Sequence, residues 1–492
     1  MNWESLFRRG SYRTVIRTLA TSRLLAPVRN AGLRVLESKI CEFFVEQNPY
    51  NRPRQVQRDK ADCLIALFHC ALRSLQKGNI SREVLDRVLD SFVGNVLCGR
   101  EALHAAERRL GFEPPGFLVI SPTKRCNLRC TGCYAASDAT ARSSIDRQTF
   151  ERILDEKERL WGSHFTVISG GEPFLWKDDG CDLIEIAARH PAQFFLVYTN
   201  GTLIDKERAR RLAEVGNLSP AISVEGFEEE TDARRGKGVH KKILKAFENL
   251  RQVGVPFGIS ITATCHNWDL VTSERFHDYY FLEQGATYAW LFQYMPIGRK
   301  HTLDLMVTAQ QRLEMWHRMW DLVRRKKYFI VDFWNSGTAS SGCIAFGRGG
   351  GYLYIDWDGD VTPCVFVPYA AANIHETYAS GGNLDTLLEV PFFKEGRQWQ
   401  DRYGYNQPAE RVHNWLCPCV YRDHYEVFLE AARAHDPKPI DEGAAQALAD
   451  PAYHRGMREY GETYRRLAAP LWAERYAEAN KAASAAAKDA GG

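Results

Sequence analysis

The sequence predicts an α/β fold organised around a parallel sheet. From Gly116 onward, short β-branched or aromatic runs alternate with longer helical stretches. The runs are 117–120, 165–168, 194–198, 221–224, 257–262 and 289–294, with helices near 147–161, 181–189, 205–215, 240–253 and 273–284. Such repeats favour right-handed crossovers in an open doubly wound sheet or a partial barrel. The chemistry is then expected at the carboxyl ends of the strands.

The regions on either side of the repeats have different patterns. A helix near 308–326 and a strand near 328–334 complete the predicted barrel unit, residues 115–335. Apolar residues at helical spacing predict a helical domain over 1–105, with Ser81 capping one helix. Residues 340–430 have little regular periodicity and several tight turns, and they predict a separate small domain. Residues 431–492 are expected to form a helical tail, frayed at its end.

Charge and hydropathy narrow the classes of partner. The 492 residues have a formal net charge of +3, so no nucleic-acid partner is expected. No apolar stretch is long enough for a membrane span, and no secretory signal is evident, which favours a cytoplasmic location. Residues 1–40 contain eight basic residues against Glu4 and Glu37. This basic amphipathic segment predicts either peripheral membrane contact or an arm packed on the protein body.

Thirteen cysteines without an export signal indicate a reducing compartment, where clustered cysteines more often bind metal than form disulfides. Cys126, Cys130 and Cys133 follow the first predicted strand directly, with no fourth cysteine or histidine nearby. Three thiolates suit a cubane iron–sulfur cluster with one iron open, whereas a structural zinc site closes with four ligands. The triad therefore favours a cluster, with zinc as the alternative.

Several motifs together resemble the radical S-adenosylmethionine (SAM) superfamily over about residues 115–335. The Cys-x3-Cys-x2-Cys triad is followed by Ser-Gly-Gly-Glu-Pro after the second strand, Tyr-Thr-Asn-Gly after the third and Ser-Val-Glu-Gly after the fourth. The resemblance implies a partial (β/α)6 barrel. It also implies that the cluster and these segments bind SAM, through Gly170, Gly171, Glu172, Pro173, Asn200, Ser223 and Glu225.

Two positions depart from the family pattern. The residue before the third cysteine is often aromatic and contacts adenine, but here it is Gly132, so Tyr134 is expected to take this role. The fourth-strand segment often ends Leu-Asp-Gly, and here Glu225 keeps the acidic group on a longer side chain. That difference puts its ribose contact in doubt.

The resemblance also implies a mechanism. The open iron chelates SAM, one electron cleaves its carbon–sulfur bond, and the resulting 5′-deoxyadenosyl radical removes hydrogen from an unactivated C–H bond. A low-potential donor such as flavodoxin or ferredoxin is the implied redox partner. The reaction class is oxidoreduction, or formation of a C–C or C–S bond.

A second cysteine group lies downstream: Cys343, Cys364, Cys417 and Cys419. The segment 358–364, Asp-Gly-Asp-Val-Thr-Pro-Cys, resembles the C-terminal SPASM or twitch extensions of radical SAM enzymes. This resemblance implies one auxiliary [4Fe–4S] cluster bound by all four cysteines, which suits electron transfer. A structural zinc site with four cysteine ligands is the alternative.

The substrate is not fixed by these motifs. Tyr294 and Arg299, after the sixth strand, are the candidate catalytic residues, with Arg299 expected to clamp a carboxylate or phosphate. The basic start slightly favours a lipid or isoprenoid at a membrane surface. A ribosomal peptide or a small metabolite is the alternative substrate, and a non-catalytic iron–sulfur electron carrier is the alternative class of protein.

Overall fold

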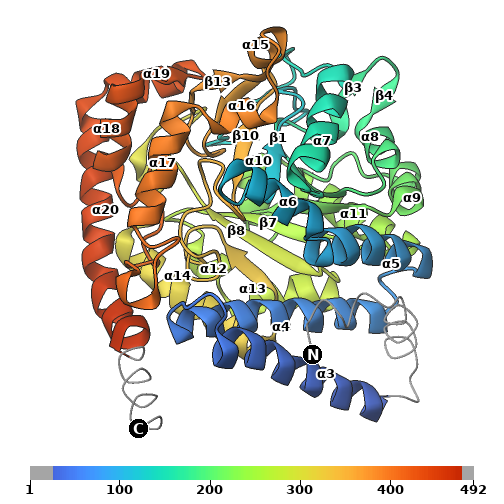
Figure 1. Ribbon diagram of the computed structural model, residues 1–492. Coiled ribbons are helices and arrows are strands. Elements are labelled where there is room, and N and C mark those ends of the chain that lie inside the picture. The colour runs from blue at the N-terminus through green and yellow to red at the C-terminus, as the bar shows by residue number, and fades with distance from the viewer. Residues whose placement is uncertain (1–25, 479–492) are drawn as a thin grey trace, which may run out of the picture.

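The computed structural model describes residues 26–478 (Figure 1). The first part of the basic segment, residues 1–25, and the tail after residue 478 lie outside the described residues. A predicted membrane contact through residues 1–40 therefore falls mostly outside them. No helix in the described part of the chain is both long and apolar enough to cross a bilayer.

The centre of the molecule is a ten-stranded sheet in the order β13-β11-β10-β1-β2-β5-β6-β7-β8-β9. Neighbours from β10 to β9 are all parallel. The seven strands predicted from the sequence are β1 (Phe117–Ile120), β2 (Phe165–Ile168), β5 (Phe194–Thr199), β6 (Leu218–Val224), β7 (Gly258–Ala263), β8 (Tyr288–Gln293) and β9 (Ile330–Asp332). The α/β fold class is confirmed. Strand β1 is not at the edge of the sheet, because strands from the C-terminal region extend the sheet beyond it.

Helices cover the outer face of this sheet (Figure 1). They are α7 (Arg147–Trp161), α8 (Leu183–Arg189), α9 (Lys206–Val215), α10 (Glu228–Arg235), α11 (Val239–Val253), α12 (Trp268–Val271), α13 (Glu274–Asp278), η4 (Tyr279–Glu283), α14 (Ala309–Asp321) and η6 (Leu322–Lys326). Asp146, Asp182 and Asp205 cap α7, α8 and α9 by accepting backbone N–H bonds. Short elements on the connecting loops are η3 (Pro173–Leu175), β3 (Lys177–Asp178), β4 (Cys181–Asp182) and η5 (Leu303–Leu305).

The N-terminal helices pack on the barrel. They are α3 (Ala26–Cys41), η1 (Glu42–Gln47), α4 (Arg54–Gln76), α5 (Arg82–Val88), η2 (Leu89–Cys98) and α6 (Glu101–Leu110), and Ser81 caps α5 as predicted. Buried Asp59 on α4 accepts hydrogen bonds from Thr338 (2.7 Å) and Tyr476 (2.8 Å) and pairs with Arg324 (2.7 Å). One carboxylate thus joins the first, middle and last parts of the described chain.

The C-terminal region shares the barrel's sheet. Strand β10 (Tyr352–Ile355) pairs in parallel with β1, and β11 (Asp360–Thr362) and β13 (Ala372–Asn373) follow it in antiparallel pairing. The remaining elements are β12 (Tyr369–Ala370), α15 (Ile374–Ala379), α16 (Leu384–Leu388), α17 (Pro391–Arg402), η7 (Ala409–Arg411), α18 (Tyr425–His435), β14 (Lys438–Pro439), α19 (Glu442–Ala449), α20 (Pro451–Trp472) and η8 (Ala473–Glu478). The region predicted as a separate domain over 340–430 therefore continues the sheet at the β1 edge.

Candidate active site

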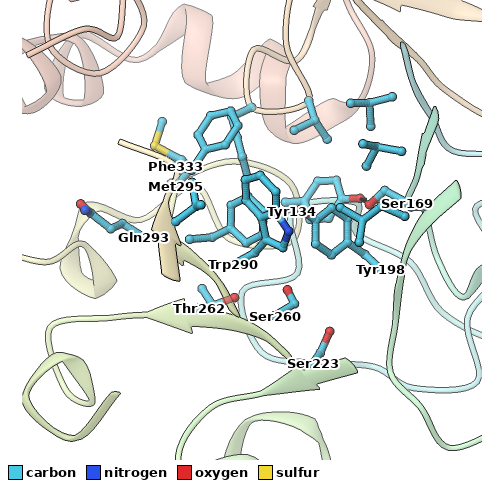
Figure 2. Close-up of a pocket in the computed structure, with 18 of the residues that line it drawn as sticks. Tyr134, Ser169, Tyr198, Ser223, Ser260, Thr262, Trp290, Gln293, Met295 and Phe333 are labelled. Atoms are coloured by element: carbon cyan, nitrogen blue, oxygen red, sulfur yellow. Dashed lines mark hydrogen bonds between the residues drawn. The ribbon is translucent and has the colours of Figure 1, made fainter. Parts of the chain in front are cut away.

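A cavity of about 350 Å³ extends from the amino ends of β1 and β2, at Phe117 and Phe165, to the carboxyl ends of the barrel strands. Its wall is mainly aromatic and aliphatic, with Trp290 near the centre of the view and Phe333 and Met295 beside it (Figure 2). A row of hydroxyl groups, Ser223, Ser260 and Thr262, projects from β6 and β7 below the tryptophan (Figure 2). An apolar cavity with a few placed polar groups is typical of a ligand site.

The predicted cysteine triad borders this cavity. All three thiols line it, together with Gly170, Gly171 and Asn200 of the predicted SAM segments. The Cys126 sulfur accepts from the Leu128 backbone N–H at 3.4 Å, and the Asn200 amide lies 3.8 Å away. Gly171 packs so tightly that a Cβ there would overlap the Lys124 and Arg125 carbonyl oxygens. The glycine is therefore required by the close approach of the cysteine loop.

The Glu172 carboxylate accepts hydrogen bonds from other groups of the protein. Its buried carboxylate accepts from Thr199 Oγ1 (2.7 Å) and from the backbone N–H groups of Phe174 (3.2 Å) and Asn200 (2.8 Å). Burial raises its pKa, against the opposing effect of these hydrogen bonds. The carboxylate holds the ends of β2 and β5 together, and Glu172 and Pro173 are not among the residues that line the cavity.

Tyr134 is fixed by hydrogen bonds to the glycine segment. Its hydroxyl lies 2.6 Å from Ser169 Oγ and accepts the Gly170 backbone N–H at 3.2 Å. Figure 2 shows Tyr134 and Ser169 close together on the cavity wall. Burial raises the pKa of the phenol, so it is neutral and can both donate and accept.

Tyr294 occupies the space beside Gly132. A Cβ at position 132 would lie 2.8 Å from Cε2 of the Tyr294 ring. The Tyr294 hydroxyl donates to the Lys300 carbonyl, and burial raises the pKa of the phenol to about 12. Gly132 has no aromatic side chain of its own, but the ring of Tyr294, the residue after β8, lies beside it.

Glu225 is engaged by two arginines rather than open to the cavity. Its buried Oε1 accepts from Arg234 Nη1 (2.5 Å) and Arg235 Nε (2.8 Å), while Oε2 accepts the Thr262 backbone N–H (3.2 Å). Both arginines line the cavity, and Arg235 Nη1 lies 4.0 Å from the Cys130 sulfur. The sequence interpretation missed these arginines, although an Arg-Arg pair at the end of the helix after the fourth strand was visible.

Arg299, predicted to clamp a substrate carboxylate or phosphate, is not among the residues that line the central cavity. It lines a second, more open cleft, its backbone N–H donates to the Cys133 carbonyl at 3.0 Å, and its guanidinium donates to the Ser137 carbonyl. These bonds hold the cysteine loop from its outer side.

The triad region has the features that an iron–sulfur cluster and SAM require. The Cys126 sulfur accepts a backbone N–H, a guanidinium lies beside Cys130, and Gly171 allows close approach of the cysteine loop. Burial raises the pKa of Cys126 to about 12, so metal binding has to displace the thiol proton. Within the described residues, no three His, Cys, Asp or Glu side chains are arranged to hold a single metal ion. A cubane cluster does not need such convergence, because its cysteines bind separate irons.

The four cysteines of the second group come from three chain segments, and each is buried or half-buried. Burial raises the pKa of the Cys419 thiol, and so does the charge of Asp423. The charges of Cys343 and Cys364 raise it further. Cys364 Sγ lies 2.9 Å from the Tyr352 hydroxyl. Cys417, fully buried, lies near Asp423, Arg312 and Arg465, and Asp423 also accepts the Cys419 backbone N–H at 3.0 Å.

Gln293 and Asp332 form a polar pair on the cavity wall. The Gln293 amide nitrogen donates to both Asp332 oxygens, at 3.1 and 2.9 Å. This bond fixes the orientation of the amide, and within the described residues its buried Oε1 has no hydrogen-bond partner. A buried acceptor of this kind is suited to a ligand donor.

Known proteins are similar to this chain in sequence. The model of the Radical SAM superfamily matches residues 120–270. The Fe-coproporphyrin III synthase of Methanosarcina barkeri is 35% identical over 169 residues, 32% of this chain and 41% of that protein. The mycofactocin maturase MftC of Mycolicibacterium smegmatis is 30% identical over 306 residues, 59% of this chain and 74% of that protein. The sporulation killing factor maturation protein SkfB of Bacillus subtilis is 28% identical over 290 residues, 55% and 66% of the two chains.

The chain thus spans less than half of the synthase but about three quarters of the maturase. The match runs through the cysteine triad and the glycine segment that border the cavity. The chain belongs to the radical SAM superfamily.

Proposed function

We propose that the protein is a radical SAM maturase that removes a hydrogen atom from an apolar or aromatic side chain of a peptide, with a small metabolite as the alternative. The observation that carries this proposal is the aromatic cavity with the cysteine triad in its wall. A cavity of about 350 Å³ has to hold the reacting part of SAM as well as the substrate group. It therefore favours a side-chain-sized group.

The chain's own residues bind and orient the reactants. Cys126, Cys130 and Cys133 would hold the [4Fe–4S] cluster, and the glycine segment, Asn200 and Ser223 would hold SAM. When bound, the cluster and SAM supply a 5′-deoxyadenosyl radical that abstracts hydrogen. Arg234 and Arg235 present positive charge to the SAM carboxylate, and Glu225 fixes their position. The apolar wall excludes water from the reacting group.

Gln293 supports recognition of a polar substrate atom. Its free Oε1 can accept one N–H or O–H from the substrate, because Asp332 occupies the amide nitrogen. A peptide N–H or a small-metabolite hydroxyl meets this requirement, and a hydrocarbon chain does not. The relatives, named as maturation enzymes and a synthase, also favour these substrates over the lipid expected from residues 1–40.

We also propose an auxiliary [4Fe–4S] cluster at the second cysteine group. Cys364 and Cys419 each accept a backbone N–H, from Phe366 (3.5 Å) and Arg422 (3.4 Å), as Cys126 does in the first group. Hydrogen bonds of this kind stabilise thiolate ligands and tune a cluster's potential. Zinc remains the competing occupant.

The test uses anaerobically reconstituted protein. We expect about eight irons per chain, as two four-iron clusters require, and 5′-deoxyadenosine after addition of dithionite and SAM. Cys126→Ala should abolish the product, and Cys41→Ala, on α3 away from both cysteine groups, should leave it unchanged. A full iron content without SAM cleavage under any reductant would instead support the electron-carrier alternative. Flotation of the full chain with anionic liposomes would restore the lipid hypothesis.

A further inference from the structure

The chain segment that carries Cys343 lies against three positive side chains, two of which come from the N-terminal region. We propose that Arg348, Lys60 and Arg52 support the auxiliary cluster, by holding the Cys343 segment in place and by offsetting the cluster's negative charge. The N-terminal region is then part of the auxiliary centre, although none of the four cysteines lies in it. This inference rests on the proposed auxiliary cluster.

Arg348 holds the backbone of this segment. The side chain is buried, and its Nη2 donates to the carbonyl oxygens of Ser340 (2.7 Å) and Gly342 (3.3 Å). Its Nε donates to the Cys343 carbonyl, which also accepts the Gln400 amide at 3.1 Å. One buried guanidinium therefore fixes the backbone of the first auxiliary cysteine.

Two further cations reach the segment from the N-terminal region. Half-buried Lys60, on α4, donates to Ser341 Oγ at 2.7 Å. Arg52, just before α4, donates to the Tyr405 carbonyl, and the centre of the Tyr405 ring lies 4.0 Å from the guanidinium carbon of Arg348. Lys60 is within electrostatic range of both arginines. The three cations are thus neighbours beside residues 340–343.

Within the described residues, none of these cations forms an ion pair. Each donates to neutral oxygens, which belong to carbonyl groups or to a hydroxyl. Burial, and then Arg52 and Arg348, lower the pKa of Lys60 to about 7, and no acid opposes them. Cations removed from water are usually paired, because an unpaired charge is costly to bury.

The nearby acids do not supply the missing charge. Asp59, next to Lys60 on α4, pairs with Arg324 at 2.7 Å. Burial raises the pKa of Asp401 and the charge of Arg348 opposes this effect, but the two groups form no ion pair in the described part of the chain. The site thus keeps an excess of positive charge. A four-iron cluster bound by cysteine thiolates is negatively charged and offsets it.

The experiment isolates the auxiliary cluster by removing the other one. In a Cys126→Ala, Cys130→Ala, Cys133→Ala background, about four irons should remain per chain. Adding Lys60→Met should leave these irons in place but make the midpoint potential more negative, because one positive charge is lost. At the midpoint of the background variant, we expect the ratio of reduced to oxidised cluster to fall roughly three- to tenfold in a redox titration followed by EPR.

Two matched variants separate charge from packing. Lys60→Arg keeps the charge and should restore the potential, whereas Ser341→Ala removes only the hydrogen bond and should change it little. An unaltered potential in Lys60→Met, with four irons bound, would overturn the inference and leave the auxiliary cluster intact. An equal shift in Ser341→Ala would also overturn it, because the effect would then come from the hydrogen bond. Zinc or no metal in the background variant would instead overturn the cluster itself, and this inference with it.

A second measurement addresses the positioning role of Arg348. In the same background, Arg348→Met should reduce the iron content, because the carbonyl groups around Cys343 lose their shared donor. Iron per chain is measured on protein with a native circular dichroism spectrum. Arg433→Met, at an exposed site on α18, is the control and should bind all four irons. Full iron loading in Arg348→Met would overturn the positioning role.

Discussion

Arg235 joins the Glu225 carboxylate to the cysteine triad. Its Nε donates to Glu225 at 2.8 Å, and its Nη1 lies 4.0 Å from the Cys130 sulfur. After the opposing effect of burial, Glu225 and Cys130 raise the pKa of this arginine. A permanent positive charge is thus held beside the proposed SAM cluster by an acid that does not itself line the cavity.

Arg235→Met should make the potential of the SAM cluster more negative and slow SAM cleavage roughly tenfold, since a charged hydrogen-bonding group is removed. Redox titration followed by EPR measures the first effect, and 5′-deoxyadenosine formation measures the second. Arg210→Met, at an exposed site on α9, is the control and should change neither. An unaltered potential in Arg235→Met would show that the arginine acts only through packing.

Tyr134→Phe should weaken SAM binding by up to about thirtyfold, because two hydrogen bonds to the 169–170 segment are lost at about 1 kcal/mol each. Anaerobic equilibrium dialysis gives the Kd. Tyr328→Phe also loses a phenolic hydrogen bond, to Asp278, but at the edge of β9, and it should leave the Kd unchanged. Equal Kd values for the two variants would contradict the prediction.

Gly171→Ala should impair assembly of the SAM cluster, because the new methyl group overlaps the backbone carbonyls of the cysteine loop. We expect less iron after reconstitution and no measurable SAM binding. Gly32→Ala is the comparison, since a Cβ there meets open space on α3 and improves helix propensity. Full iron loading in Gly171→Ala would mean that the loop can move away without loss of the site.

Asp356→Asn should stabilise the protein at high pH. Burial and then Asp360 raise the pKa of Asp356 to about 7, whereas the unfolded residue titrates near 4. Between these values the folded state binds more protons than the unfolded state, so wild-type stability falls as pH rises through this window. The variant removes that penalty, which is at most about 4 kcal/mol at pH 8.

Thermal unfolding at pH 4 and pH 8 measures this difference. The Asn side chain keeps an oxygen for the Asp358 and Asp360 N–H groups, so the two proteins should differ little at pH 4. A variant that is equally destabilised at both pH values would contradict the raised pKa of Asp356, because the loss of stability would not depend on ionisation of the carboxyl group.

Local patterns were sufficient to predict most of the barrel. The β1 and β2 ranges coincide with the predicted runs, and α7 with its predicted helix, because each pattern depends on a few neighbouring residues. The parallel pairing of β10 with β1 was not predictable in this way, since the paired residues are more than two hundred positions apart. It depends on tertiary packing rather than on a periodic pattern.

The candidate site, like the fold, was predictable from local patterns only in part. Motif spacing identified the triad and the glycine segment, which do border one cavity. Spacing could not show that Glu225 is enclosed by Arg234 and Arg235, or that Tyr294 fills the space beside Gly132, since these contacts depend on side-chain geometry.

The hydrogen bond between Asp59 and Tyr476 can form only after the C-terminal part of the chain has been synthesised. Its partners are separated by 417 positions, so helix α4 leaves the ribosome long before the tyrosine that completes its contacts. Both cysteine groups emerge in that interval. A nascent chain therefore presents its thiols while the ends of the protein are still apart, and cofactor insertion can precede the final locking of the fold.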